Sequence, residues 1–329
     1  MAVRLVHQDR SSVGLGGPRW ILRLLIPLIL GALISPASAG PRRSLQYLFP
    51  MDQLESFSFE VESVAETQLV RKPADAARFD LAPVEARLLD VRTRSQGRLD
   101  RSLARVFRDG SLGLIVRVVD LQGSVQRGDE GAREPLELGG LNGKSVALRV
   151  HASGELLDSH GWSHILGAQR PGSVLGDLFL QSILRLPRHP PKSSSPMSVT
   201  FRTRVPVDGS LQRDRTWTLT YRRAEAPSAC GKGCLAMAYE GEVLERSADT
   251  HPARPMELRG KASVSGLIVL RSRRSRLVSH SWTSQWTHEV KTKGSEGRVR
   301  GEVVQVLREE GSIRALASEG TDRSSGARP

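Results

Sequence analysis

Apolar and polar side chains alternate with a period of two in one segment after another of this 329-residue chain. Phe57, Phe59 and Val61, for example, are separated by Ser58 and Glu60. Successive side chains of a β-strand point to opposite faces of a sheet, so this period predicts half-buried strands. The same pattern occurs at residues 112–118, 146–150, 199–201, 217–221, 235–239 and 278–288. Residues 84–107 are less regular, and we interpret them as strands as well.

One segment departs from this period. Ser173 is a suitable N-cap for a helix, and Pro187 would end it because proline lacks the backbone N–H that a helix needs. Apolar residues share one side of this helix: Val174, Leu175, Leu178, Phe179, Ile183 and Leu186. The residues from Pro187 to Pro196 are rich in proline and serine, which predicts a crossover loop.

These elements predict a mainly β fold. Glycine, aspartate, serine and proline separate the strands, as turns require, so neighbouring strands are expected to run antiparallel. We expect a first β-meander over residues 40–170, the helix and crossover over 171–196, a second meander over 197–317 and a disordered tail over 318–329. The meanders would form a curved sheet, an open barrel or a sandwich, with the central helix plugging one end or covering an edge.

The two halves share a pattern that suggests an internal duplication. Gly143-Lys144 precedes a strand and then Ser159-His160-Gly161-Trp162, whereas Gly260-Lys261 precedes a strand and then Ser279-His280-Ser281-Trp282. Repetition of a supersecondary unit at similar spacing is typical of duplicated architectures.

The first 39 residues predict a secretory signal. Arginines precede an apolar core, and Ala37-Ser38-Ala39 is the small-x-small triplet at which cleavage before Gly40 is expected. A retained membrane anchor is the alternative, but the apolar core is shorter than a membrane span and contains Pro27. The chain is therefore expected to be exported, to the periplasm or the extracellular space.

The formal net charge is +13. Basic chains bind nucleic acid, anionic glycans or anionic lipids, and export argues against nucleic acid. The densest basic cluster contains Arg271, Arg273 and Arg274. It is interpreted either as a solvated hairpin turn or as a contact for lipopolysaccharide, phospholipid headgroups or another polyanion.

Two cysteines, Cys230 and Cys234, enclose Gly231-Lys232-Gly233. In an oxidising compartment such a pair predicts a disulfide, and the short loop means that the bond would mainly fix a turn. A redox-active Cys-x-x-Cys motif and the further ligands of a zinc site are both missing from this region of the sequence.

Histidines and tryptophans are the candidate ligand-binding residues. His160 with Trp162, and His280 with Trp282 and Trp286, lie on strands whose aromatic faces could line an acyl-chain cavity or stack on sugars. Burial in a sheet face is the alternative for each of them. No metal or cofactor is predicted, because the ligands that would complete a metal site are not evident.

Parts of the chain resemble an uncharacterised family of exported bacterial β-rich proteins. The resemblance lies in residues 138–154, in Leu186-Pro187 and in the aromatic strands 217–221 and 235–239. The chain departs from that family after Pro187, where a valine and a glycine-containing turn are usual and this loop is rich in proline and serine. The resemblance implies an exported β-rich fold and no established activity.

The sequence thus favours a non-catalytic exported envelope protein that binds an amphiphilic or anionic ligand, such as a lipid, lipopolysaccharide or glycan. No Gly-x-Ser-x-Gly elbow, phosphate loop or His-Glu-x-x-His motif occurs in it. A periplasmic hydrolase with a site assembled from distant strands is one alternative, and a structural partner in an envelope complex is another. The sequence does not determine the oligomeric state.

Overall fold

A computed structural model describes residues 44–51, 53–71, 90–128, 131–136, 138–161, 174–192, 194–206, 211–249, 256–271, 275–293 and 299–316. These residues form twelve β-strands, one α-helix and two short 3-10 helices. The elements are, in chain order, β1 (Leu54–Arg71), β2 (Val91–Val106), β3 (Leu112–Arg127), β4 (Arg133–Pro135), η2 (Gly139–Leu141), β5 (Ser145–Val150), β6 (Leu156–His160), α3 (Val174–Gln181), β7 (Met197–Pro206), β8 (Leu211–Ala224), η3 (Ser228–Gly233), β9 (Cys234–Asp249), β10 (Met256–Arg271), β11 (Arg276–Lys293) and β12 (Val299–Ala315).

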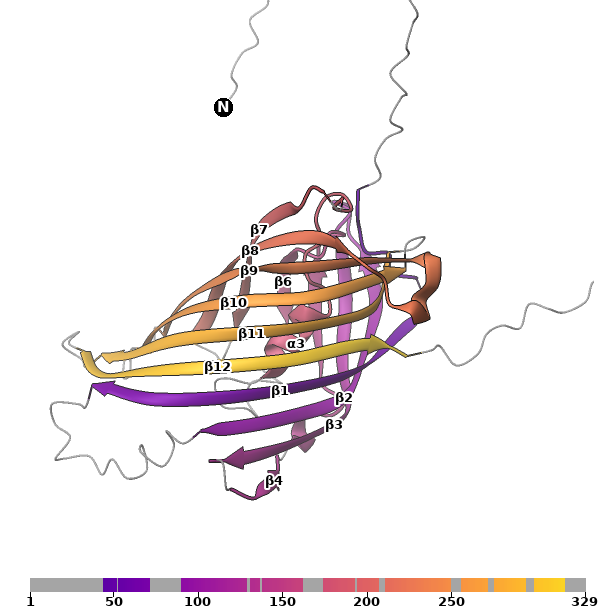
Figure 1. Cartoon of the computed structure of the whole chain (residues 1–329). Helices are drawn as coiled ribbons and strands as arrows, with labels where there is room; N and C mark the ends of the chain where they lie inside the picture. Colours follow the sequence, from indigo (N-terminus) through magenta and orange to yellow (C-terminus); the bar gives the residue numbers. More distant parts are fainter. Residues whose placement is uncertain are drawn as a thin grey trace, which may run out of the picture. The chain divides into compact units, whose positions relative to one another are not determined.

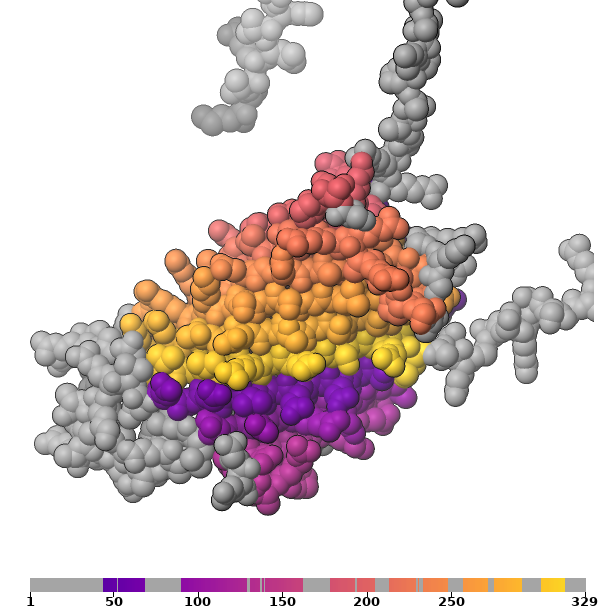
Figure 2. All heavy atoms as spheres, viewed as in Figure 1, coloured from indigo at the N-terminus to yellow at the C-terminus, as the bar shows by residue number. Residues whose placement is uncertain are grey.

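The strands form one antiparallel sheet that curls into a nearly closed barrel with a single seam. Their order is β6-β5-β3-β2-β1-β12-β11-β10-β9-β8-β7, and β4 pairs with β3 beside this path. The two predicted meanders therefore share one sheet, because β12 pairs with both β1 and β11. Figure 2 shows this junction on the surface, where yellow β12 lies against indigo β1. The seam separates β6 from β7, which approach each other without a hydrogen-bonded ladder.

Period-two alternation decides which face of each strand is buried, as the sequence predicts. On β8, Trp217, Leu219 and Tyr221 point inward and are buried. Outward positions of the same strand pair with β7 through polar groups, such as Thr218 with Thr200 and Asp214 with Arg204. All the strand segments predicted from alternation lie in strands, and the strand interpretation of residues 84–107 is confirmed where the chain is described, in β2.

The helix α3 lies inside the curved sheet near one end of the barrel, behind β11 and β12 in Figure 1. Leu178 and Phe179 are fully buried against the inner face. The segment after the helix is fixed by two tyrosines, since Tyr47 donates to the carbonyl of Leu184 and Tyr221 donates to that of Arg185. The predicted plug is therefore present, made of the helix together with the chain that follows it.

The helix is shorter than the sequence suggested. It ends at Gln181, although the apolar side continues through Ile183 and Leu186, both of which are buried. Ser182 ends it, because its hydroxyl donates to the carbonyl of Phe179 and its own carbonyl accepts a hydrogen bond from Arg101. The predicted N-cap, Ser173, lies outside the described residues. In the predicted crossover from Pro187 to Pro196, the described residues 187–192 and 194–196 contain no helix or named strand, and an isolated bridge joins Lys192 to Ser195.

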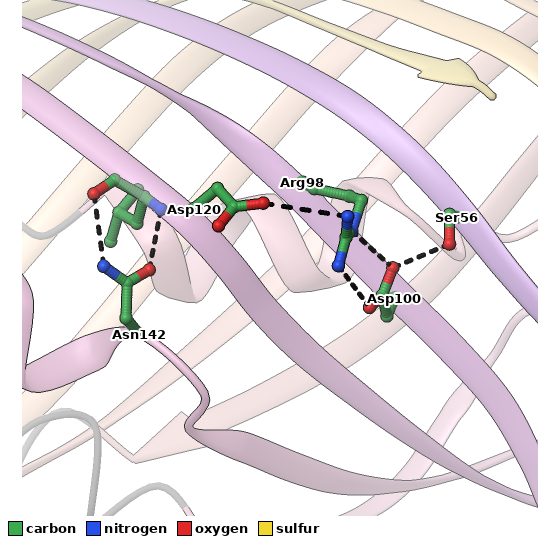
Figure 3. Close-up of polar contacts among 6 residues, drawn as sticks. Ser56, Arg98, Asp100, Asp120 and Asn142 are labelled. Carbon is green, nitrogen blue, oxygen red and sulfur yellow. Dashed lines mark hydrogen bonds and ion pairs between the residues drawn. The ribbon is translucent and has the colours of Figure 1, made fainter.

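A bulge bends the sheet between β2 and β3. The register shifts between Gln96 and Arg98, and opposite this shift Asp120 adopts a left-handed backbone with φ of 54°. Asn142 holds the next residue, because its side chain accepts from the N–H of Leu121 at 2.7 Å and donates to the carbonyl of Leu121 at 3.4 Å. Figure 3 shows these contacts beside an outward network in which Arg98 joins Asp120 to Asp100. The bulge marks the point where β3 changes partner from β5 to β4.

Aromatic rings cover glycines on the inner face. A Cβ atom at Gly311 would lie 2.2 Å from a ring carbon of Trp282, and one at Gly266 would lie 2.6 Å from the Tyr239 hydroxyl. Both glycines pair directly with Trp282 across the strands. The absent side chains therefore leave the space in which the two rings pack, and they allow the sheet to curve tightly at this level.

The two halves match only in part. Both repeated segments span a hairpin, β5–β6 in the first half and β10–β11 in the second. Gly143, however, lies in a turn with φ of 77°, whereas Gly260 lies within β10. The internal duplication therefore stays a prediction. The predicted signal and the tail from residue 318 lie outside the described residues. No helix within the described part of the chain is long and apolar enough to cross a membrane.

Candidate functional site

The inner face of the barrel changes from apolar to polar along its axis. Next to α3 it is lined by apolar and aromatic side chains, among them Phe57, Leu99 and Ile268. Toward the other end, one cross-strand row is almost entirely polar. Cross-strand pairing aligns its members in the order Thr203, Arg215, Glu245, Gly260, His288, Gln305 and Thr67. Buried polar rows are costly, so this row is a candidate site.

Two arginines converge on one buried carboxylate in this row. Nε of Arg215 lies 2.6 Å from one oxygen of Glu245, and Nε of Arg213 lies 3.3 Å from the other. The Glu245 side chain is fully buried, that of Arg215 is 2 % exposed and that of Arg213 is 14 % exposed. Removing a carboxylate from water costs several kcal/mol unless cations and hydrogen bonds compensate, which explains why the three groups lie together.

Aromatic rings enclose this cluster. The guanidinium carbon of Arg215 lies 4.6 Å from the ring centre of Trp286, a cation–π contact. Trp286 also stacks on His288 with centroids 5.1 Å apart. Trp217, on β8 like Arg215, stacks on Phe201 of β7, and its indole N–H donates to the hydroxyl of Thr203 on β7. The cationic groups therefore adjoin a row of buried aromatic rings further into the barrel.

Some polar atoms of the cluster have no hydrogen-bond partner among the described residues. These atoms are Nε of Arg213, Oε1 of Glu245 and Oγ of Ser247, which follows Glu245 on the same inward face of β9. Arg213 has Glu245 as its ion-pair partner within the described chain, and Glu245 is shared with Arg215. A guanidinium has five N–H donors, so Arg213 can bind a further acceptor.

A second polar cluster joins the sheet to α3. Nδ1 of His280 donates to the carbonyl of Gln181 at 2.8 Å, and the Tyr239 hydroxyl donates to Nε2 at 2.9 Å. These directions are those of the neutral ring, which is the form present near pH 7. Burial lowers its pKa to about 4, and the hydrogen bond to Gln181 offsets part of that shift. Burial also raises the pKa of Tyr239 well above its usual range. These groups are bonded to each other and fix the helix.

Arg101 forms the other charged link to the plug. Its guanidinium pairs with Glu55 at 2.9 Å and donates to the carbonyl of Ser182 at 2.7 Å. It also lies over the rings of Phe49 and Phe57. The Arg101 side chain is only 1 % exposed, and its contacts fix the segment after α3 in place.

The structure separates the histidines and tryptophans that the sequence singled out. His280, Trp282 and Trp286 lie on one inward face of β11, and the indole N–H of Trp282 donates to Glu309 at 2.7 Å. His160 instead lies on the edge strand β6, where its side chain is 76 % exposed and pairs with Asp158. His160 and His280 therefore do not form one site, since the first lies in solvent and the second is buried in the barrel. Trp162 lies outside the described residues.

Of the basic cluster, Arg271 is exposed at the end of β10, whereas Arg273 and Arg274 lie outside the described residues. The predicted disulfide between Cys230 and Cys234 is present, with Cα atoms 5.9 Å apart, and it joins η3 to the start of β9. Within the described residues no group of three histidine, cysteine or acidic side chains is arranged to hold a metal ion.

Sequence reasoning missed Arg213, Arg215 and Glu245. The signal was available: Arg213 and Arg215 share the parity of Trp217, and Glu245 shares that of Tyr239. Extending the strand predicted at 217–221 back by four residues, and the strand predicted at 235–239 forward by six, at constant parity places these charges on the buried face. Charged residues at buried positions are rare unless they are paired, which makes them informative.

No protein-family model matches the chain, so the resemblance to exported β-rich proteins stays a prediction. No curated protein matches it either. Among solved structures, one of lipovitellin that concerns its lipid–protein interactions is similar to this chain over 83 % of the chain's length. The TM-score is 0.43 and the sequence identity is 11 %. The chain spans about a quarter of that protein, 26 % of its length. The outer membrane protein OprG of Pseudomonas aeruginosa is similar over 84 % of this chain and 100 % of its own, with a TM-score of 0.21 and 6 % identity. OccK11 (OpdR) of the same organism has a TM-score of 0.18 and 6 % identity over 83 % of this chain and 99 % of its own.

Proposed function

We propose that this chain is a non-catalytic, exported envelope protein that binds an anionic amphiphile inside its barrel. The supporting observation is the buried group in which Arg213 and Arg215 share the carboxylate of Glu245. Arg213, the more accessible of the two, would bind the anionic group. The adjoining rings of Trp217, Phe201 and Trp286 would contact the apolar part.

Two features support export. The predicted signal over residues 1–39 directs the chain out of the cytoplasm. The disulfide between Cys230 and Cys234 is the kind of bond that persists in an oxidising compartment. Processing before Gly40 is checked by N-terminal sequencing of the chain recovered from the envelope fraction.

The polarity of the two faces supports an internal ligand. Outward positions carry ion pairs such as Arg222 with Glu240 and Lys261 with Glu242, whereas aromatic side chains point inward. Transmembrane barrels have the opposite arrangement, with an apolar band outside. An amphiphile in contact with this chain would therefore find its apolar partners on the inner face.

Native mass spectrometry of the purified chain tests the proposal. We expect co-purifying lipid or another anionic amphiphile, and binding of a fluorescent anionic fatty acid in solution. Arg213→Gln should weaken that binding by about tenfold, since one charge-assisted hydrogen bond is worth about 1.5 kcal/mol or more. Arg308→Gln, on the outward face of β12, is the matched control and should leave it unchanged.

Three results would contradict the proposal. One is the absence of any bound amphiphile together with no uptake of the fluorescent probe. Another is an equal effect of Arg213→Gln and Arg308→Gln, which would show that only the overall charge matters. A third is turnover of an added ester or glycoside by the purified chain, which would favour the hydrolase alternative.

A further inference from the structure

The seam between β6 and β7 has an unusual polarity of strands. The hydrogen-bonded path contains eleven strands, and each neighbouring pair in it is antiparallel. The first and last members of an odd series run in the same direction, so β6 and β7 are parallel to each other. They cannot complete the antiparallel ladder themselves. A single extended segment placed between or along them would be antiparallel to both.

Unpaired backbone groups remain on both sides of this seam. Among the described residues, β6 pairs with β5 alone and β7 pairs with β8 alone. Each edge therefore presents N–H and C=O groups that no described strand satisfies. Such edges are a template for adding an extended peptide. A lipid tail offers no matching row of donors and acceptors.

A groove of about 870 Å³ lies along the seam, lined by residues of β6, β7, β8 and β9. Its lining includes two leucines that are exposed on the surface, Leu157 at 49 % and Leu244 at 51 %. Leu157 belongs to β6, across the seam from β7, and Leu244 belongs to β9, which β8 separates from β7.

The groove also carries unbalanced positive charge. Arg204 pairs with Asp214, and Asp158 pairs with His160. Arg202 and Arg246 line the same groove, and neither has an ion-pair partner within the described part of the chain. Arg202 shares an outward cross-strand row with Thr216 and Leu244, and Arg246 lies on the next outward row with Asp214 and Arg204. A segment paired with the β7 edge would place one outward carboxylate beside Arg202 and a second, two residues away, on the row of Arg246.

We infer that this groove binds an extended acidic peptide. Carboxylates at its outward positions would bind Arg202 and extend toward Arg246, and the peptide backbone would pair with the β7 edge. A second copy of this chain is a poor occupant, because edge-to-edge pairing of two β7 strands would bring Arg202 and Arg204 toward the same arginines.

Peptide binding to the full exported chain tests this inference. A fluorescent peptide of alternating glutamate and valine should bind with a dissociation constant in the micromolar range, and the lysine–valine analogue should not bind. Arg202→Glu should weaken binding by at least about tenfold, since it replaces attraction by repulsion. Arg308→Glu, an exposed arginine on β12 without an ion pair among the described residues, is the matched control and should have little effect.

Hydrogen exchange locates the peptide. Amides of β6 and β7 should exchange more slowly in the complex, and Arg213→Gln should leave the effect unchanged, which separates this site from the barrel interior. Equal weakening by Arg202→Glu and Arg308→Glu, or protection elsewhere, would overturn the inference. So would a dimer with both edges already protected, or binding of anionic vesicles through Arg202 without protection of these edges.

Discussion

Tyr239 and His280 share a hydrogen bond of 2.9 Å inside the barrel, and the other ring nitrogen of His280 donates to the carbonyl of Gln181 at the end of α3. Because a carbonyl can only accept, the proton of the neutral ring resides on Nδ1, and Nε2 accepts from the tyrosine hydroxyl. Strands β9 and β11 and the end of α3 are thus joined by one neutral imidazole.

This connection predicts acid sensitivity. Burial holds the pKa of His280 at about 4 in the folded chain, whereas an unfolded histidine titrates near about 6.5. The unfolded state therefore takes up the proton first as the pH falls. The contribution of His280 to stability is complete above about pH 6.5 and is lost progressively toward pH 4, by about 3 kcal/mol in total.

Urea unfolding at pH 7.5 and pH 4.5 measures this effect. The wild-type chain should lose up to about 3 kcal/mol more than His280→Gln between the two conditions, because the variant lacks the titrating ring. An equal loss in both proteins would show that other groups cause the acid sensitivity.

Gly311 should not tolerate a larger residue. A Cβ atom there would come within 2.2 Å of the Trp282 ring, so Gly311→Ala should cost about 1–3 kcal/mol in the free energy of unfolding. Gly233→Ala is the control, since nothing lies within 4 Å of the added atom. In a Trp282→Leu background the cost at position 311 should largely disappear, and a double-mutant cycle without coupling would refute the packing argument.

Asn142 should stabilise the bulge through its short bond. Asn142→Ala leaves the backbone of buried Leu121 without two partners and should cost about 1–3 kcal/mol. Asn142→Asp keeps the acceptor of the 2.7 Å bond and should cost less. The amide of Leu121 should exchange faster in the alanine variant than in the aspartate variant, and identical exchange in both would contradict this role.

The disulfide should have a small and local effect. Native, oxidised protein should resist thiol labelling at Cys230 and Cys234. Replacing both cysteines by serine should lower the free energy of unfolding by about 2 kcal/mol, the value expected for so short a loop. Faster exchange should be confined to η3 and the start of β9. Ready labelling of the native protein would show that the bond is not formed in solution.

Much of this fold follows from the sequence, because period-two alternation at positions such as Phe57, Trp217 and Trp282 reports directly on burial. The helix was found for the same kind of reason, but its end was not, since the stop at Ser182 depends on Arg101 from a distant strand. The polar cluster was missed for a related reason. Arg215 and Glu245 look like ordinary surface charges until their parity is compared with that of neighbouring aromatic residues.

The pairing of β12 with both β1 and β11 has a consequence for how the chain folds. Every other link of the sheet joins strands of one meander, whereas the β1–β12 link joins the first and last described strands. Until β12 is in place, β1 and β11 each keep one unpaired edge. Pairing between segments so far apart in sequence is slow, so we expect closure at this link to be a late step of folding and the two open edges to be exposed to aggregation before it.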